Sequence, residues 1–154
     1  MEIREVVEVT RPIEVVFPYL ADFQHLTEWD PATVRVASRT PGPLAVGTTY
    51  EVVSAFRGRE VELRYTVTDY DPPQRIILHG ESDSVGAVDE MTFEPVPDGT
   101  RVTYVARFRF NNRLVGWIAP LMLRGAFKRL GREAAEGIRA AVDGLPREHR
   151  DEEA

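Results

Sequence analysis

The feature that most constrains this chain is a change in its hydrophobic period late in the sequence. Between Val34 and Phe110, apolar and polar residues alternate in short runs, which is typical of half-buried strands. From about Arg113 to Asp143, apolar residues recur at three- and four-residue spacing, which predicts one long amphipathic helix. A sheet with one apolar face needs a cover, and such a helix needs a sheet. This order predicts an α+β fold in which a curved antiparallel sheet wraps around a C-terminal helix.

Seven strands and two further short helices are expected. The first strand spans Glu2 to Thr10, and both short helices follow it. Pro12 marks the start of the first helix, because proline is favoured at the first helical position, and Pro18 limits that helix to about two turns. The second short helix runs from Phe23 to Trp29. The other six strands are expected at residues 34–40, 48–57, 60–70, 75–82, 85–94 and 101–110. Their connections are short, so neighbouring strands should pair antiparallel.

The size and charge of the chain limit its number of domains and its possible partners. A chain of 154 residues and 17.4 kDa predicts a single domain over residues 1–146, followed by a charged tail at 147–154. The net charge of −6 disfavours nucleic acid and anionic membranes as partners, because both would repel the protein. The N-terminus lacks the apolar segment of a signal peptide, and the longest apolar stretch, Leu114 to Leu123, is about half as long as a membrane span. A soluble cytoplasmic protein is therefore expected, and the sequence leaves a monomer and a homodimer open.

Several kinds of site have no support in the sequence. There is no Gly-x-Ser-x-Gly elbow, no P-loop and no Gly-x-Gly-x-x-Gly, which disfavours nucleophilic hydrolysis and nucleotide binding. The chain has no cysteine, and none of His25, His79 and His149 has a second ligand at a metal-binding spacing. We therefore expect no metal and no cofactor. Alternation turns His79 outward, whereas His25 lies close to Trp29 and is expected near the mouth of a pocket.

A ligand site is predicted on the concave face of the sheet. A curved sheet around a helix seldom closes tightly, and the remaining space suits an apolar ligand. Alternation assigns residues from four strands to this face, three of them tyrosines whose hydroxyls need a partner from either the ligand or the core. The residues expected to contact the ligand are Trp29, Tyr50, Ser54, Tyr65, Asp89, Met91, Tyr104, Phe108, Trp117 and Met122.

Asp89 is the one catalytic candidate that the sequence offers. It interrupts an otherwise apolar face between Ala87 and Met91. If Asp89 points into the cavity, burial raises its pKa and allows it to act as a general acid or base. The more ordinary interpretation is a bulge or strand end that turns Asp89 to water, because the nearby Gly86 suits a bulge.

The apolar run from Leu114 to Leu123 has three interpretations. Core packing combined with pocket lining is favoured, because Trp117 and Met122 suit an adaptable apolar wall. The alternatives are a gate over the pocket and a surface that contacts a partner.

Several segments of the chain match the pattern of a known family. They are PYLAD at 18–22 with EWDP at 28–31, VTDYDPP at 67–73, and the span from FEP to GTRV at 93–102. Together with the order of the elements, they make residues 3–142 resemble the polyketide cyclase/dehydrase family of the START-like (SRPBCC) superfamily. The resemblance implies a helix-grip fold. It leaves the function open, because the superfamily includes ligand carriers, hormone receptors, coenzyme Q-binding proteins and some cyclases, and no catalytic motif carries over residue by residue.

The favoured hypothesis is the binding of a small hydrophobic or aromatic molecule, lipid-, polyketide- or quinone-like, between the sheet and the long helix. Apolar burial would supply most of the affinity. The first alternative is a polyketide cyclase or dehydratase that uses Asp89 as its acid or base in the same cavity. The second alternative is a module that binds a partner protein through the apolar start of the long helix.

Overall fold

The computed structural model describes residues 1–110 and 124–146 of the chain. The expected order of strands and helices is confirmed, with most boundaries within two residues of the prediction. The elements are β1 (Glu2–Val9), α1 (Ile13–Ala21), the 3-10 turn η1 (Phe23–His25), α2 (Leu26–Trp29), β2 (Thr33–Ser38), β3 (Thr49–Phe56), β4 (Arg59–Asp71), β5 (Arg75–Glu81), β6 (Val85–Val96), β7 (Gly99–Phe110) and α4 (Arg124–Asp143). The predicted start of the long helix, from 113 to 123, lies outside the described residues.

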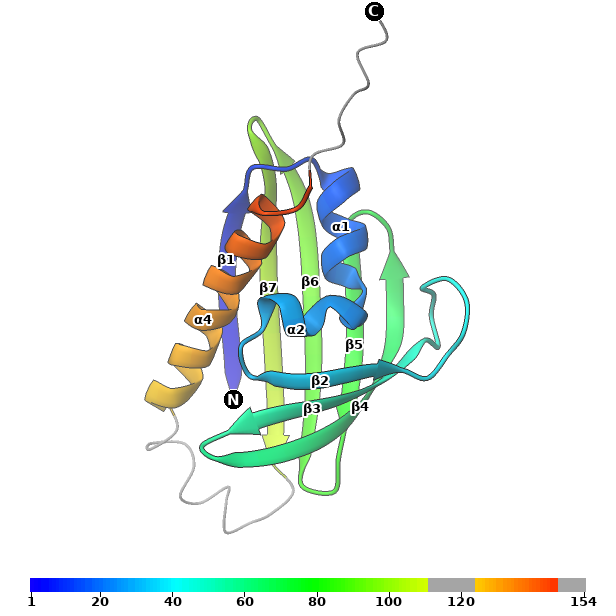
Figure 1. Ribbon diagram of the computed structural model, residues 1–154, viewed down its shortest axis with the longest axis vertical. Helices are drawn as coiled ribbons and strands as arrows, with labels where there is room; N and C mark the ends of the chain where they lie inside the picture. Colours follow the sequence, from blue (N-terminus) through cyan, green and yellow to red (C-terminus); the bar gives the residue numbers. More distant parts are fainter. Residues whose placement is uncertain (111–123, 147–154) are drawn as a thin grey trace, which may run out of the picture.

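The strands form one seven-stranded antiparallel sheet in the order β1-β7-β6-β5-β4-β3-β2. Each strand from β2 to β6 pairs with the next strand in sequence, as short connections favour. The last strand, β7, also pairs with β1, which forms one edge of the sheet. Figure 1 shows the result: β1, β7, β6 and β5 stand nearly upright, whereas β2, β3 and β4 sweep across them. The sheet is therefore strongly curved, which confirms the predicted α+β architecture with its long C-terminal helix.

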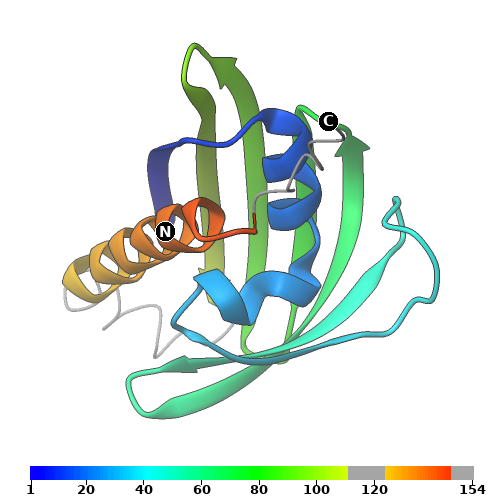
Figure 2. The ribbon, with the colours of Figure 1, turned by 45° about the horizontal axis from the view of Figure 1, so that its top comes forward.

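The α-helices of the described residues, α1, α2 and α4, share the concave face of the sheet. Helix α4 packs chiefly on β1 at one edge of the sheet, whereas α1 covers β6 in its middle (Figure 1). Helix α2 lies between them and contacts α4, and Figure 2 shows that all three helices lie within the curve of the sheet. The part of the face near β3, β4 and the lower end of β7 carries no helix of the described chain.

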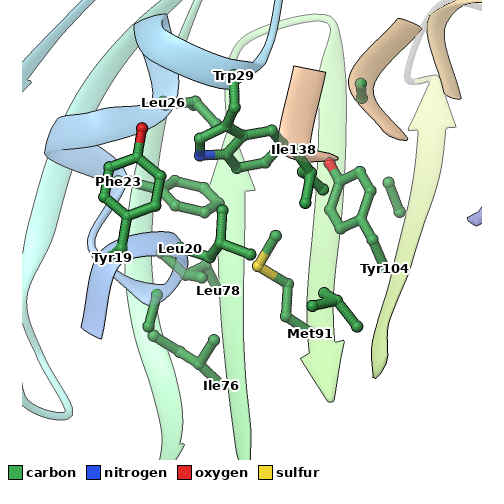
Figure 3. Close-up of a cluster of buried hydrophobic side chains, with 14 of the residues drawn as sticks. Tyr19, Leu20, Phe23, Leu26, Trp29, Ile76, Leu78, Met91, Tyr104 and Ile138 are labelled. Atoms are coloured by element: carbon green, nitrogen blue, oxygen red, sulfur yellow. The ribbon is translucent and has the colours of Figure 1, made fainter. Parts of the chain in front are cut away.

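The core lies mainly under α1 and α2. Figure 3 shows Leu20 and Phe23 from the helical segment directed onto Leu78 and Met91 from the sheet. Each of these four side chains is fully buried. The ring of Phe17 meets that of Phe93 edge to face at 5.0 Å, which fixes α1 over β6. This part of the concave face is consequently filled by side chains.

The end of α4 is anchored to the loop that follows β1. Arg11, which is 9% exposed, donates a hydrogen bond of 2.8 Å to the carbonyl of Leu145. The side chain of Asp143 accepts hydrogen bonds from the backbone and the hydroxyl of Thr10. These contacts satisfy groups at the helix C-terminus and hold α4 at a fixed angle across β1. No helix among the described residues is long and apolar enough to cross a membrane.

Candidate functional site

A cavity of about 150 Å³ lies between the concave face of the sheet and α4. Its walls come from β1, α2, the α2–β2 corner, the four strands β3, β4, β6 and β7, and α4, so residues distant in sequence meet around it. The lining is mainly apolar and comprises Ile3, Leu26, Asp30, Ala32, Val52, Ser54, Ala55, Phe56, Val61, Leu63, Tyr65, Val85, Asp89, Tyr104, Phe108, Phe110, Phe127, Leu130, Gly131 and Ala134. Neither a lysine nor an arginine nor a histidine belongs to this lining within the described parts of the chain.

One end of the cavity is formed by four phenylalanine rings. Phe127, from the first turns of α4, lies with its ring centroid 5.3 Å from Phe56 and 5.2 Å from Phe108. Phe110 meets the same ring edge to face at 6.1 Å. Phe127 is buried, whereas the three strand residues are half-buried. These rings offer a broad, adaptable apolar surface to a planar ligand.

The other end of the cavity holds a buried carboxyl group. Asp89 is only 5% exposed, and its Oδ2 accepts a hydrogen bond of 2.9 Å from the hydroxyl of Tyr104. Its Oδ1 is buried without a hydrogen-bond partner among the described residues. The pKa of Asp89 is raised to about 7, chiefly by burial and also by the negative charge of Asp30, while the Tyr104 and Tyr65 hydroxyls act in the opposite direction. Asp89 is thus poised to change its charge near neutral pH.

The interpretation of Asp89 as a residue turned to water by a bulge is wrong. The register of β6 runs without interruption past Gly86 on both sides, with Asp89 opposite Leu78 of β5 and Ala106 of β7. Side chains alternate strictly along such a strand, so Asp89 points to the same face as Ala87 and faces the cavity. The Tyr104 hydroxyl reaches Asp89 diagonally, since Tyr104 itself stands opposite Met91.

A glycine on β5 allows Tyr65 to extend towards Asp89 from two strands away. Tyr65 of β4 pairs with Gly80 of β5, which pairs with Ala87 of β6. A Cβ atom at Gly80 would lie 2.7 Å from two carbon atoms of the Tyr65 ring, so the ring occupies the space above the glycine. The ring of Phe23 packs edge to face on the other side at 5.4 Å. The pKa of Tyr65 is raised well above its usual value. Burial is the largest cause, and the negative charges of Asp89 and Asp30 act in the same direction.

Asp30 is a second cavity carboxylate that the sequence reasoning did not single out. It lies at the corner between α2 and β2, where its side chain accepts hydrogen bonds from the backbone N–H of Ala32 at 3.0 Å and the hydroxyl of Thr33 at 2.8 Å. Burial raises the pKa of Asp30, and the two hydrogen bonds oppose that shift. Its position directly after a helix and before Pro31 indicates a turn, but no sequence pattern places that turn beside β6.

The predicted ligand-binding residues divide into three groups. The cavity lining includes Ser54, Tyr65, Asp89, Tyr104 and Phe108. The lining does not include Trp29, Tyr50 and Met91, which are buried in the core instead. Trp117 and Met122 lie outside the described residues, as does the whole apolar run from 114 to 123. The gate and the partner surface that the sequence left open for this run fall on the same residues.

Local packing accounts for the position of each of these three buried residues outside the cavity lining. Tyr50 donates a hydrogen bond of 3.0 Å to Asp22, which ties it to the end of α1. Met91 lies beneath α1, beside Leu20, as Figure 3 shows. Trp29 packs edge to face on Tyr104 at 5.9 Å, and its indole N–H is buried without a partner among the described residues.

Neither His25 nor His79 belongs to the lining of this cavity. His25 stacks on Tyr19 at 4.7 Å, and its Nδ1 lies 2.9 Å from the carbonyl oxygen of Tyr19. His79 is exposed, as alternation predicts. Within residues 1–110 and 124–146, no group of three or more histidine, aspartate or glutamate side chains is arranged to hold a metal ion.

The chain matches the family described as "Polyketide cyclase / dehydrase and lipid transport" over residues 1–143. No curated protein matches it. Among solved structures, a protein of Thermus thermophilus is 15% identical with a TM-score of 0.79, over 92% of this chain and 97% of that one. The Zhui aromatase/cyclase from Streptomyces sp. R1128 is 16% identical with a TM-score of 0.76, over 93% of both chains. A START superfamily protein from Mycobacterium smegmatis is 16% identical with a TM-score of 0.70, over 93% and 94%. These similarities show the fold, and the match over residues 1–143 shows that the chain belongs to the polyketide cyclase/dehydrase and lipid transport family.

Proposed function

We propose that this protein binds a small aromatic molecule in the cavity between the sheet and α4. The observation that carries the proposal is an apolar cavity of about 150 Å³ whose lining includes one buried carboxyl group with an unpartnered oxygen. An engineered apolar cavity of about this volume binds benzene, so the space accommodates one aromatic ring. A longer lipid-, polyketide- or quinone-like molecule would place one ring or chain segment here.

The two ends of the cavity suggest how the ligand would be held. The rings around Phe127 supply apolar area, and burial of that area stabilises the complex by about 25 cal/mol per Å². Asp89 and Tyr65 at the opposite end supply the few polar groups that orient a ligand in such pockets. Ser54, which is half-buried, adds a hydroxyl along the wall.

Titration with p-xylene tests the cavity itself. We expect p-xylene to bind at a single site with a dissociation constant of about 1 mM or tighter, the range of a modest apolar association. Isothermal titration calorimetry measures it. A substitution that fills the space, Ala134→Leu, should weaken binding at least about tenfold, because Ala134 is buried in the lining.

Ala140→Leu is the matched control for Ala134→Leu. Ala140 lies on the same helix but is exposed, so the same added side chain should leave p-xylene binding unchanged. Equal loss of binding in both variants, or the absence of p-xylene binding to the unmodified protein, would contradict the proposal.

Acid–base catalysis in the same cavity is a second candidate function. The observation that favours it is the pKa of Asp89, which burial raises to about 7, so that both of its protonation states are available near neutral pH. A cyclase or dehydratase needs such a group beside its substrate, and the solved relatives include an aromatase/cyclase.

A model substrate tests this candidate. 5-Nitrobenzisoxazole opens to a coloured cyanophenolate when a base removes its ring C–H proton, and the N–O bond breaks in the same step. If Asp89 serves as a base, the rate should rise with pH through about 7, and Asp89→Asn should lower it about 100-fold. The exposed Asp83→Asn is the control and should keep the full rate. An unchanged rate in Asp89→Asn would exclude Asp89 as the base.

A further inference from the structure

We propose that the natural ligand is an uncharged aromatic molecule with a hydroxyl group that donates a hydrogen bond to Asp89 Oδ1. This inference rests on the proposed function and adds the chemical class of the ligand. It follows from three features of the cavity: one unused acceptor, a nearby second hydroxyl, and an excess of negative charge.

The unused acceptor is Oδ1 of Asp89. Tyr104 already donates to Oδ2, whereas Oδ1 is buried and has no partner among the described residues. A buried polar atom without a partner destabilises a folded protein, because it has lost its hydrogen bonds to water. A ligand that donates an O–H or N–H to this atom removes that penalty, whereas a purely apolar ligand leaves it in place.

The charges around Asp89 disfavour an anionic ligand. Asp30 from the α2–β2 corner lies close enough to raise the pKa of Asp89, and Glu133 of α4 acts in the same direction on Asp30. The sheet residues that act on Asp89 are Tyr104 on the adjoining strand β7 and Tyr65 on β4, two strands away, each through its hydroxyl. The described lining supplies no basic side chain, so a carboxylate or phosphate would meet only negative charge in an apolar space.

The hydrogen-bonding groups favour a hydroxyl over an ammonium group. A hydroxyl carries one donor and two acceptor positions, whereas an ammonium group carries three donors and no acceptor. One ligand hydroxyl can therefore donate to Asp89 Oδ1 and accept from the hydroxyl of Tyr65, which also belongs to the lining. An ammonium group could donate to Oδ1 but has no acceptor for the hydroxyl of Tyr65.

Three probes of matched shape test the inference by calorimetry. They are p-xylene, p-cresol, in which a hydroxyl replaces one methyl group, and p-toluate, in which a carboxylate replaces it. We expect p-cresol to bind about tenfold tighter than p-xylene, since a hydrogen bond to a charged group adds that much. p-Toluate should not bind measurably. Asp89→Asn should abolish the preference for p-cresol and leave p-xylene affinity within about twofold, because Tyr104 then donates to the amide oxygen and the amide NH₂ faces the cavity.

The outcomes separate the inference from the proposed function. If p-xylene does not bind the unmodified protein, the proposed function fails and the inference fails with it. If p-xylene binds but p-cresol is not preferred, or p-toluate binds as well as p-cresol, the inference alone is overturned. The inference alone is also overturned if the Asp89→Asn variant still binds p-cresol more tightly than p-xylene. A preference for 4-methylbenzylamine over p-cresol would assign the site to a cation and would also overturn it.

A measurement without any variant guards against misfolding of Asp89→Asn. The preference for p-cresol over p-xylene should grow several-fold between pH 6 and pH 8, because the charged carboxylate is about twice as strong an acceptor as the neutral group. The affinity for p-xylene should stay constant over the same range. A preference that does not change with pH would contradict the contact with Asp89.

Discussion

Asp89→Asn is expected to make the protein more stable at pH 8 by up to about 4 kcal/mol. Asp89 is 5% exposed, and burial raises its pKa from 3.8 to about 7. Above pH 7, the folded protein therefore holds a charged group in an apolar place, whereas the unfolded chain exposes that group to water. Asparagine has the same shape and can still accept the hydrogen bond from Tyr104.

The sign of the pH dependence follows from the raised pKa. Below pH 3.8 the carboxyl group is neutral in both states, so it does not oppose folding. As pH rises from about 4 to 7, the unfolded chain loses its proton first, and the contribution of Asp89 to stability falls. Between pH 5 and pH 8 we expect this loss to reach about 3 kcal/mol in the unmodified protein.

Urea denaturation at pH 5 and pH 8 measures this effect. The Asp89→Asn variant lacks the titrating carboxyl group. The difference in its free energy of unfolding between pH 5 and pH 8 therefore gives the effect of all other groups. Asp83→Asn is the matched control: Asp83 is exposed in the turn before β6, and its loss should change stability by no more than about 0.5 kcal/mol. A pH difference that is the same in Asp89→Asn and the unmodified protein would show that Asp89 carries no such penalty.

The second large effect is expected for Gly137→Ala, which should lower the free energy of unfolding by about 3 kcal/mol or more. A Cβ atom at Gly137 of α4 would lie 1.8 Å from the carbonyl oxygen of Trp29 at the end of α2. Both partners are backbone in packed helices, so neither can yield without moving a helix. Alanine favours helices over glycine by about 1 kcal/mol, but this gain is smaller than the clash.

Gly125→Ala is the control for Gly137→Ala. Gly125 lies on the same helix, and a Cβ atom there would meet nothing within 4 Å. We expect this variant to be as stable as the unmodified protein or up to about 1 kcal/mol more stable. Equal denaturation midpoints for the two variants would contradict the close packing of α4 against α2. That packing also positions the cavity, because Asp30 follows Trp29 directly and Ala134 precedes Gly137 by one turn.

The spacing of apolar residues along the sequence was enough to predict the strands and helices and the buried face of each. Along β7, alternation placed Tyr104 on the buried face, whereas along β6 it placed Asp89 among apolar residues but left open the bulge that would have turned this residue to water. Short connections were enough to predict antiparallel pairing, since they leave neighbouring strands little choice. The fold was therefore predictable because each of these signals is local.

The shape of the cavity was not predictable, because it depends on how distant elements cross. Alternation gives Met91 and Asp89 the same face, but only the position of α1 buries the first in the core and leaves the second beside a cavity. Likewise, Asp30 reaches the site because α2 ends beside α4, and Tyr65 because Gly80 on another strand leaves room for its ring. Such contacts join residues far apart in sequence and leave no periodic signal.

The most direct test of the central claim is the location of bound p-xylene by nuclear magnetic resonance. Intermolecular nuclear Overhauser effects would be recorded between p-xylene and the methyl groups of the protein. We expect them at Val52, Leu63 and Leu130, which line the cavity, and not at Val46, which is 62% exposed. Contacts at Val46 and other surface methyl groups, with none at the three cavity residues, would contradict the assignment of this cavity as the ligand site.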